Sequence, residues 1–338
     1  MKREKVRVIQ VGVGGFGQSW LELMVGYEEV EVVAAVDQLE ANLKNVTELY
    51  GSSISTFTDL SEAIKQTKAD IVFIITPPVT HAPLAKQAIE NGLHVVMEKP
   101  LTNTMAEAED LLAFVRHHHS KVMVSQNYRW NPQIQTVKKL VEQGAIGEIE
   151  YGDYYFNRAT RFGGWRDEYE DILLQDMAIH HFDILRFLLG KEVTEISAHS
   201  FRPTWSWFKG MPHANVALLF DGTTPINYIG RWAGKGRQTP WNGELRLVGE
   251  KGAVELINDE VFFYKDEEQE PEKIPLIEQA LPDRLLSLQS FIEAIRHDVE
   301  PPTSIVDNIK SLAVTDAAIK AAKTGVKQTV KGAETTTG

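Results

Sequence analysis

Residues 6–17 read VRVIQVGVGGFG, an apolar run that ends in the spacing G-x-G-x-x-G. A strand that leads through this spacing into a helix forms a dinucleotide-binding turn. Gly12 permits the tight turn, Gly14 lets the backbone approach a pyrophosphate, and Gly17 allows close packing of helix on strand. A helical pattern over residues 16–25 follows directly. The predicted phosphate-binding residues are Gly12, Gly14, Gly15, Phe16 and Gly17.

An acidic residue follows at the spacing expected for a contact with the adenosine ribose. The second apolar run, VEVVAAVD, ends in Asp37, 20 residues after Gly17. A carboxylate at this position can accept hydrogen bonds from both ribose hydroxyls, and it repels a 2′-phosphate. Gln38, Leu39 and Glu40 offer no cation to such a phosphate. We therefore predict NAD as the cofactor, with NADP less favoured.

The two halves of the chain follow different patterns. Before residue 125, fully apolar runs alternate with helical patterns, which predicts a parallel sheet covered on both faces. From about residue 149, strand-like stretches follow one another, which predicts an antiparallel or mixed sheet. Helical patterns at residues 176–190 and late in the chain complete this half. The predicted fold class is α/β with two domains.

Composition narrows the class of function. The 338 residues carry a formal net charge of −12, with 43% hydrophobic and 24% charged residues, and no segment approaches the ~20 apolar residues of a membrane span. The negative charge argues against a nucleic-acid or anionic-lipid surface. Absence of cysteine excludes disulfides and cysteine-ligated zinc, and it fits a cytoplasmic protein. Consecutive His117, His118 and His119 diverge on a helix, so we predict a helix-dipole role and no metal site.

Two stretches place reactive side chains at defined positions. Residues 94–101, HVVMEKPL, end a strand in Glu98-Lys99-Pro100, and ligands bind at the carboxyl ends of such strands. Pro100 restricts Lys99, and the bond between them is a candidate for the cis isomer. Asp176 and His180 lie at i and i+4 and so share one helix face. Oxidation of an alcohol requires a base and a cation at the oxygen, and Lys99 and His180 are suitable types.

The glycine loop, the Glu98-Lys99-Pro100 triplet and the Asp176-x-x-x-His180 pair have the spacing of the Gfo/Idh/MocA oxidoreductases. The stretches TPPVTHAPLAKQAIENGLHVVMEKPL, QNYRWNP and DMAIHHFDILRFLLG also resemble that family, over nearly the whole chain. The resemblance implies hydride transfer between a nicotinamide and a sugar, polyol or related hydroxy compound. It also implies a C-terminal α/β domain with a large open, mainly antiparallel sheet, through which we expect a homodimer or homotetramer.

We place a Rossmann domain at residues 1–128, a substrate-binding and oligomerisation domain at 129–330 and a tail at 331–338. The late helices could pack back on the first domain. By resemblance, His180 is the general acid/base, Lys99 holds the reacting oxygen, and Asp176 binds or orients the substrate. Which of Lys99 and His180 finally accepts the proton stays open. Further predicted cofactor contacts are Thr76, Pro77, His81, Glu98, Lys99 and Asn127. Predicted substrate contacts are Tyr128, Arg129, Arg158, Trp165, Arg166, Asp176 and His180.

Several of these residues have a second interpretation. Glu98 could hold Lys99 or the nicotinamide ribose, or it could simply pair with a nearby base. Arg129 could brace the domain boundary. The arginines at positions 158, 161 and 166 could bind a carboxylate or hydroxyls, or pair with the acids at positions 167, 168, 170 and 171. One or two of Trp165, Trp205, Trp207, Trp232 and Trp241 could line the pocket, the others serving as core or subunit contacts.

One departure from the family pattern concerns the substrate side. Glu170-Asp171-Ile172 stand where many relatives have three glycines, and we expect this bulkier, acidic segment to reshape that side. Two other functions are possible on the same fold. One is a dinucleotide-sensing regulatory protein without turnover, and the other is a glycoside-processing enzyme that recycles tightly bound NAD. Retention of Lys99, Asp176 and His180 together favours an enzyme.

Overall fold

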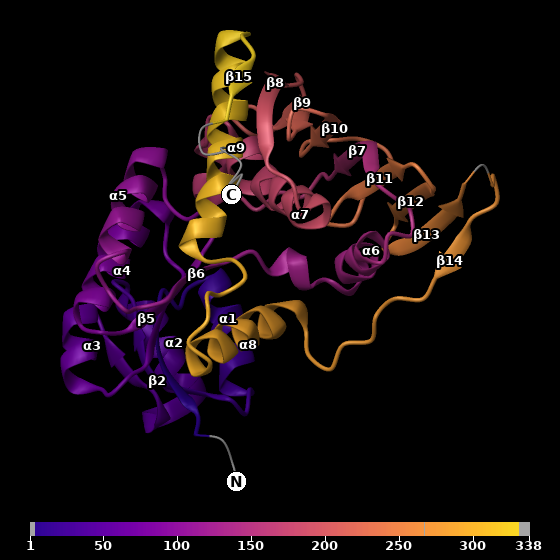
Figure 1. Ribbon diagram of the computed structural model, residues 1–338. Coiled ribbons are helices and arrows are strands. Elements are labelled where there is room, and N and C mark those ends of the chain that lie inside the picture. The colour runs from indigo at the N-terminus through magenta and orange to yellow at the C-terminus, as the bar shows by residue number, and fades with distance from the viewer. Residues whose placement is uncertain (1–3, 267, 331–338) are drawn as a thin grey trace. The chain divides into compact units, whose positions relative to one another are not determined.

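In the computed structural model, which describes residues 4–266 and 268–330, the apolar runs of the first half pair as six parallel strands (Figure 1). Their order in the sheet is β3-β2-β1-β4-β5-β6. Every residue of β4 is buried, as expected for a parallel strand covered on both faces. The strands are β1 (Val6–Val11), β2 (Val30–Val36), β3 (Ser55–Phe57), β4 (Ile71–Ile74), β5 (His94–Glu98) and β6 (Val122–Ser125). The helices between them are α1 (Phe16–Val25), α2 (Glu40–Tyr50), α3 (Leu60–Gln66), α4 (His81–Glu90) and α5 (Met105–Val115).

The chain divides into two units, and the first takes in a late segment. Unit 1 comprises the residues up to Asn127 together with Arg284–Ile309, and unit 2 comprises Tyr128–Asp283 and the residues from Lys310 onward. Residues 284–309, which we assigned to the second domain, thus belong to unit 1. There the late segment extends the edge of the sheet, since Val124 N donates to Thr303 O at 2.9 Å. The predicted tail, residues 331–338, lies outside the described residues.

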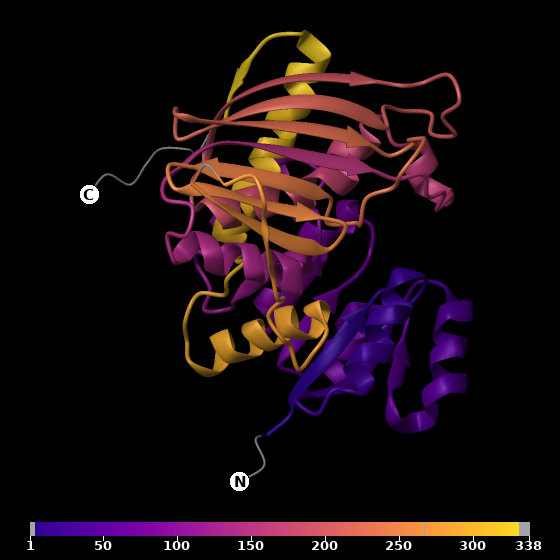
Figure 2. The same ribbon diagram turned by 90° about the vertical axis from the view of Figure 1, so that its right-hand side faces the viewer.

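Unit 2 is built on a nine-stranded sheet of order β14-β13-β12-β11-β7-β10-β9-β8-β15. All its neighbours are antiparallel except β7 and β10, which confirms the predicted mainly antiparallel sheet. Exposed and buried residues alternate along β10, so one face of the sheet is open, and Figure 2 looks onto that face. The strands are β7 (Ile149–Asn157), β8 (Val193–Phe201), β9 (His213–Phe220), β10 (Thr224–Arg231), β11 (Glu244–Gly249), β12 (Gly252–Ile257), β13 (Glu260–Lys265), β14 (Glu272–Ile274) and β15 (Gln328–Thr329).

The helices of unit 2 include one irregular segment. Residues Leu173–Ala178 wind as a π-helix, η5, and continue directly into α7 (Ile179–Leu189). Almost every residue of α7 is buried, whatever direction its side chain takes. The remaining helices are α6 (Pro132–Glu142), α8 (Asp283–Arg296), whose first residue alone belongs to unit 2, and α9 (Ile305–Thr324), which enters unit 2 at Lys310.

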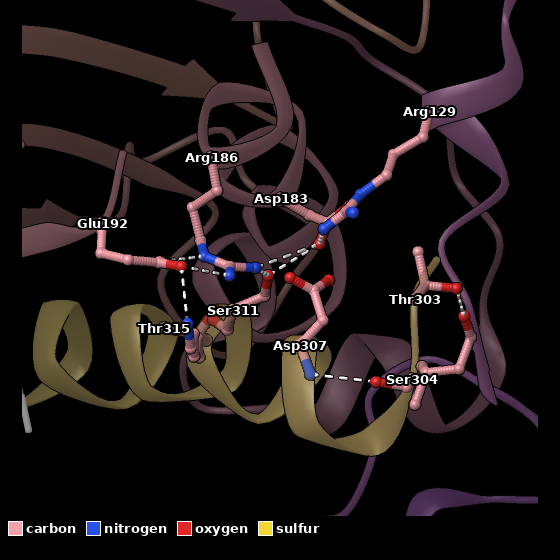
Figure 3. Close-up of polar contacts among 11 residues, drawn as sticks. Arg129, Asp183, Arg186, Glu192, Thr303, Ser304, Asp307, Ser311 and Thr315 are labelled. Atoms are coloured by element: carbon pink, nitrogen blue, oxygen red, sulfur yellow. Dashed lines mark hydrogen bonds and ion pairs between the residues drawn. The ribbon is translucent and has the colours of Figure 1, made fainter. Parts of the chain in front are cut away.

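Buried charges fix α7 within unit 2 (Figure 3). Asp183, 1% exposed, accepts hydrogen bonds from Nε and Nη2 of Arg129 at 2.6 and 2.7 Å and from Ser311 Oγ at 2.7 Å. One turn further along α7, Arg186 forms a two-bond pair with Glu192 and also donates to Ser311 Oγ. Charge-assisted bonds of this kind replace the water that these groups lose on burial. The network joins α7 to the start of β8 and to α9.

No helix among the described residues combines the length and apolar character needed to cross a membrane.

Asp183→Asn tests the importance of this network for stability. The substitution keeps the shape of the side chain but removes the carboxylate that accepts two hydrogen bonds from the buried guanidinium of Arg129. Removing one partner of a buried ion pair costs roughly 3–5 kcal/mol. We expect a clear drop in the urea midpoint. The control is Asp153→Asn, because Asp153 is exposed and its side chain accepts a single hydrogen bond from the described residues, from Asn227 at 3.0 Å. A cost below about 1 kcal/mol for Asp183→Asn would contradict this role.

Candidate active site

The glycine loop is held by very close backbone approaches. A Cβ atom at Gly12 would lie 2.3 Å from the carbonyl oxygen of Ile75, and one at Gly17 would lie 2.2 Å from that of Gly12. Side chains at either position would therefore push β1, β4 and α1 apart. The φ of +88° at Gly12 also favours glycine. Gly14 and Gly15 complete the turn, and Phe16 begins α1.

A buried glutamine that the sequence did not single out braces this loop. Gln10 Nε2 donates to the carbonyl oxygens of Gly12 and Gly17 at 2.9 and 2.7 Å. It thereby holds together the first and last glycines of the loop. Gln10 stands between apolar residues at the end of β1, and this pattern could have identified it from the sequence.

Asp37 lies directly after β2 and is bonded to the glycine loop. Its Oδ2 accepts from Val13 N and from Asn42 Nδ2, both at 3.0 Å, and its Oδ1 accepts from Leu39 N at 2.9 Å. One hydrogen bond at Oδ1 leaves that oxygen a further lone pair, which suits a ribose hydroxyl. In the described part of the chain, Asp37 forms no ion pair.

The loop that follows β4 carries the next group of predicted cofactor contacts. Thr76 is half-buried and its hydroxyl bonds that of Thr80 at 2.6 Å, while Pro77 is exposed. His81 is fully buried, with Nε2 2.9 Å from Thr76 O and Nδ1 2.9 Å from Pro100 O. Burial lowers the pKa of His81, although the two carbonyl oxygens oppose that shift. The imidazole thus joins two loops, in place of the predicted cofactor contact.

The triplet after β5 combines a buried acid with a cis peptide bond between Lys99 and Pro100. Glu98 Oε1 accepts a hydrogen bond from Trp20 Nε1 of α1 at 2.8 Å, and burial raises the pKa of Glu98. Glu98 therefore anchors α1, a role that the sequence did not predict, while its Oε2 accepts a hydrogen bond from Lys99 N at 3.3 Å. Lys99 lies at the carboxyl end of β5 and is half-buried, and Asn127 is the last residue of unit 1 before the chain enters unit 2.

Within unit 2, the predicted reactive residues occur in two pairs. Asp176, in the π-helix, accepts a hydrogen bond from Arg166 Nε at 2.8 Å and is almost fully buried. The ring of His180 stacks on that of Tyr128, with centroids 4.4 Å apart and an interplanar angle of 17°. Segments of π-helix are frequent at functional sites because they redirect side chains within a helix. The two predicted substrate residues Arg166 and Tyr128 thus orient the two predicted catalytic residues of this unit.

Arg129 has a structural role. Its guanidinium is buried and committed to Asp183 by two hydrogen bonds. Holding a buried carboxylate is a structural role, and the predicted contact of Arg129 with the substrate stays a prediction.

The remaining arginines lie over aromatic rings. The guanidinium carbon of Arg158 is 4.4 Å from the ring centroid of Trp241, and that of Arg161 is 4.7 Å from the centroid of Trp207. Neither arginine forms an ion pair with any part of the chain that the structure describes. The side chain of Trp165 lies outside the described residues. Of the other tryptophans, Trp232 is buried in the core and Trp205 is half-exposed.

The acids near these arginines bind lysines of other segments. Glu168 pairs with Lys209 at 2.6 Å, while Glu170 and Asp171 both pair with Lys323 of α9, at 2.8 and 2.9 Å. The alternative of arginine pairing is therefore wrong for these three acids. Glu170 and Asp171, which stand where many relatives have glycines, are thereby paired with a residue of α9.

A second histidine beside His180 was missed by sequence reasoning. His181 is fully buried, with Nε2 3.0 Å from the carbonyl oxygen of Trp241 and Nδ1 3.0 Å from the hydroxyl of Tyr228. Burial lowers its pKa to about 4. The neutral ring must then donate from Nε2 to Trp241 and accept at Nδ1 from Tyr228. His181 thereby connects α7 to the loop on which Arg158 stacks.

No cluster of His, Cys, Asp and Glu within residues 4–266 and 268–330 is arranged to hold a metal ion. His117, His118 and His119 follow the end of α5, where His118 Nδ1 bonds the carbonyl oxygen of Phe114 at 2.9 Å.

Comparison with known proteins supplies the family. Residues 6–126 match the family model described as "Oxidoreductase family, NAD-binding Rossmann fold". Residues 138–331 match the one described as "Oxidoreductase family, C-terminal alpha/beta domain". These are the two domain models of Gfo/Idh/MocA.

Individual relatives extend over nearly the whole chain. A D-apiose dehydrogenase of Paraburkholderia graminis is 27% identical over 96% of this chain and 89% of its own length. A 4-carboxy-2-hydroxymuconate-6-semialdehyde dehydrogenase of Sphingobium is 30% identical over 89% of this chain and 93% of its own. An oxidoreductase from Agrobacterium radiobacter, solved in complex with NAD+, L-tartaric acid and magnesium, shares the fold with a TM-score of 0.90 at 22% identity, covering 97% and 99% of the two chains. The chain belongs to the Gfo/Idh/MocA oxidoreductase family and is an NAD(P)-dependent dehydrogenase.

Proposed function

We propose that this dehydrogenase transfers a hydride between NAD and a secondary alcohol or ketone of a sugar, polyol or related hydroxy compound. The observation that carries the proposal is the pair of oriented side chains in unit 2, His180 on Tyr128 and Asp176 on Arg166. They accompany a glycine loop whose backbone approaches leave no room for side chains at Gly12 and Gly17. A regulatory sensor would need the loop but not the two pairs.

NAD, when bound, supplies the hydride acceptor or donor, and the chain supplies the other components. His180 exchanges the hydroxyl proton, since imidazole titrates near neutral pH. The Lys99 ammonium stabilises negative charge that develops on the reacting oxygen. Asp176, held in one orientation by Arg166, accepts a hydrogen bond from a substrate hydroxyl. Gly12 to Gly17 and Asp37 hold the cofactor.

Association through the open face of the nine-stranded sheet belongs to the same proposal. Tyr151, Tyr155 and Ile229 are exposed apolar side chains on strands β7 and β10. We propose that a second copy of this chain binds to this face. The mass of the protein in solution, which gives its oligomeric state, tests this proposal.

Variants at the two reactive positions test the chemistry. His180→Gln and Lys99→Met should each lower kcat by roughly 10²- to 10⁴-fold on the best substrate found in a panel of aldoses, cyclic polyols and hydroxy acids. Their affinity for NADH should change far less. The controls are His199→Gln and Lys44→Met at exposed positions. Wild-type rates in both variants would refute the assignment. NADH binding without turnover of any compound would favour a sensor, and turnover without net NADH would favour glycoside processing.

Asp37→Ser tests the choice of cofactor. Removing the carboxylate removes repulsion of a 2′-phosphate and one acceptor for the ribose, so the preference for NADH over NADPH should fall by roughly tenfold or more. Fluorescence titration with NADH and NADPH measures this preference. The control is Glu40→Gln on the neighbouring helix α2, which also removes one negative charge. A wild-type enzyme that binds NADPH more tightly than NADH would overturn the assignment.

Arg158 and Arg161 favour a substrate that carries an anionic group, because neither has a carboxylate partner among the described residues. The name of the Sphingobium relative includes a carboxyl-bearing compound, and the Agrobacterium structure was solved with L-tartaric acid. Both are consistent with an anionic substrate. We expect D-gluconate over D-glucitol and D-galacturonate over D-galactose in kcat/KM. Arg158→Gln should reduce the ratio of acid to neutral substrate by roughly tenfold. Arg246→Gln, at an exposed position on β11, should leave the ratio unchanged. An unchanged ratio in Arg158→Gln would refute the prediction.

A further inference from the structure

Helix α8 brings a cation to the first turn of α1, within unit 1. Arg284 Nη1 donates to Ser19 Oγ at 2.9 Å, and Ser19 Oγ itself donates to the carbonyl oxygen of Phe16 at 2.8 Å. The guanidinium carbon of Arg284 lies 5.4 Å from the ring centroid of Phe16 and 5.1 Å from that of Trp20. Phe16, Ser19 and Trp20 stand at i, i+3 and i+4 and form one face of α1. The arginine thus lies beside the helix that starts in the glycine loop.

The positive charge of Arg284 has no carboxylate partner in the part of the chain that the structure describes. Arg296, at the other end of α8, pairs with Glu29 at 2.5 Å and with Glu293 at 3.0 Å. Arg284 is half-buried and stacks on two aromatic rings, a contact that leaves the positive charge of its guanidinium available to an anionic ligand.

The surroundings of this charge favour an anion. Helix α1 begins at a glycine, has no side chain capping its amides and carries no acid in its first turn. The amides of such a turn bind phosphate, and the family model assigns NAD binding to residues 6–126. Arg284 lies outside that stretch in sequence but beside it in unit 1. Phe16 is 53% exposed, so this part of the loop is open to a ligand.

We propose that Arg284 binds the pyrophosphate of the dinucleotide and is a cofactor-positioning residue. Trp20, on which its guanidinium stacks, also donates to the buried Glu98 beside Lys99. The position of Arg284 is therefore set by the same side chain that connects α1 to the Glu98-Lys99-Pro100 triplet. This inference rests on dinucleotide binding by the family and not on the proposed substrate.

Binding measurements on purified full-length protein test it without turnover. Arg284→Gln should weaken NADH, by fluorescence titration, and ADP-ribose, by calorimetry, by roughly tenfold or more. Adenosine, which lacks the pyrophosphate, should bind as it does to the wild type. Arg284→Lys, which restores the charge, should recover most of the loss. Arg296→Gln is the control on the same helix and should leave all three affinities within about twofold.

Three outcomes would overturn the proposal. One is an unchanged affinity of Arg284→Gln for NADH and ADP-ribose. Another is an equal loss for adenosine, which would indicate a general disturbance of α1 in which the charge plays no part. The third is failure of Arg284→Lys to recover affinity while its circular dichroism and Tm match those of the wild type.

Discussion

The backbone contact between β1, β4 and the start of α1 is the constraint on which the cofactor side depends. At Gly12 and Gly17 the backbone lies so close to a carbonyl oxygen that a methyl group on the Cα atom would clash with it. Gln10 then fixes both glycines from within β1. Because the loop is held from inside the sheet, its outer surface and the uncapped start of α1 remain available to phosphate. Asp37, directly after β2, accepts a further hydrogen bond from the loop, so the predicted contacts for pyrophosphate and ribose are held together.

Two buried side chains, Trp20 and His81, form hydrogen bonds to the Glu98-Lys99-Pro100 triplet. Trp20 of α1 donates to Glu98, and His81 joins the loop after β4 to Pro100. The backbone around Lys99 is thus held from two directions by buried groups. Unit 2 also has buried hydrogen bonds of this kind. Arg129 and Ser311 bond Asp183 on α7, the helix that carries His180. In both units, buried polar bonds hold the elements that carry the proposed reactive side chains, as accurate positioning requires.

Local patterns predicted much of this. The glycine spacing and Asp37 lie within one strand-helix-strand unit, so their geometry follows from short-range rules. The succession of strand-like stretches predicted an antiparallel or mixed sheet, and the family resemblance implied that this sheet is large and open. Long-range partners could not be derived in this way. The pairing of Arg129 with Asp183, and of Glu170 and Asp171 with Lys323, depends on which helices pack together. Arg284 reaches α1 from 265 residues beyond Ser19. His81 was assigned to the cofactor by its loop position, whereas its burial is a property of the tertiary fold.

The claim that this chain moves a hydride to a nicotinamide can be tested by following the hydride itself. A substrate from the panel, deuterated at the carbon that bears the reacting hydroxyl, would be incubated with NAD, and both products would be analysed by mass spectrometry. The account predicts that deuterium leaves the substrate and appears in the nicotinamide ring of accumulating NADH. Conversion of the substrate with all deuterium retained, or lost to solvent with no labelled NADH, would contradict it.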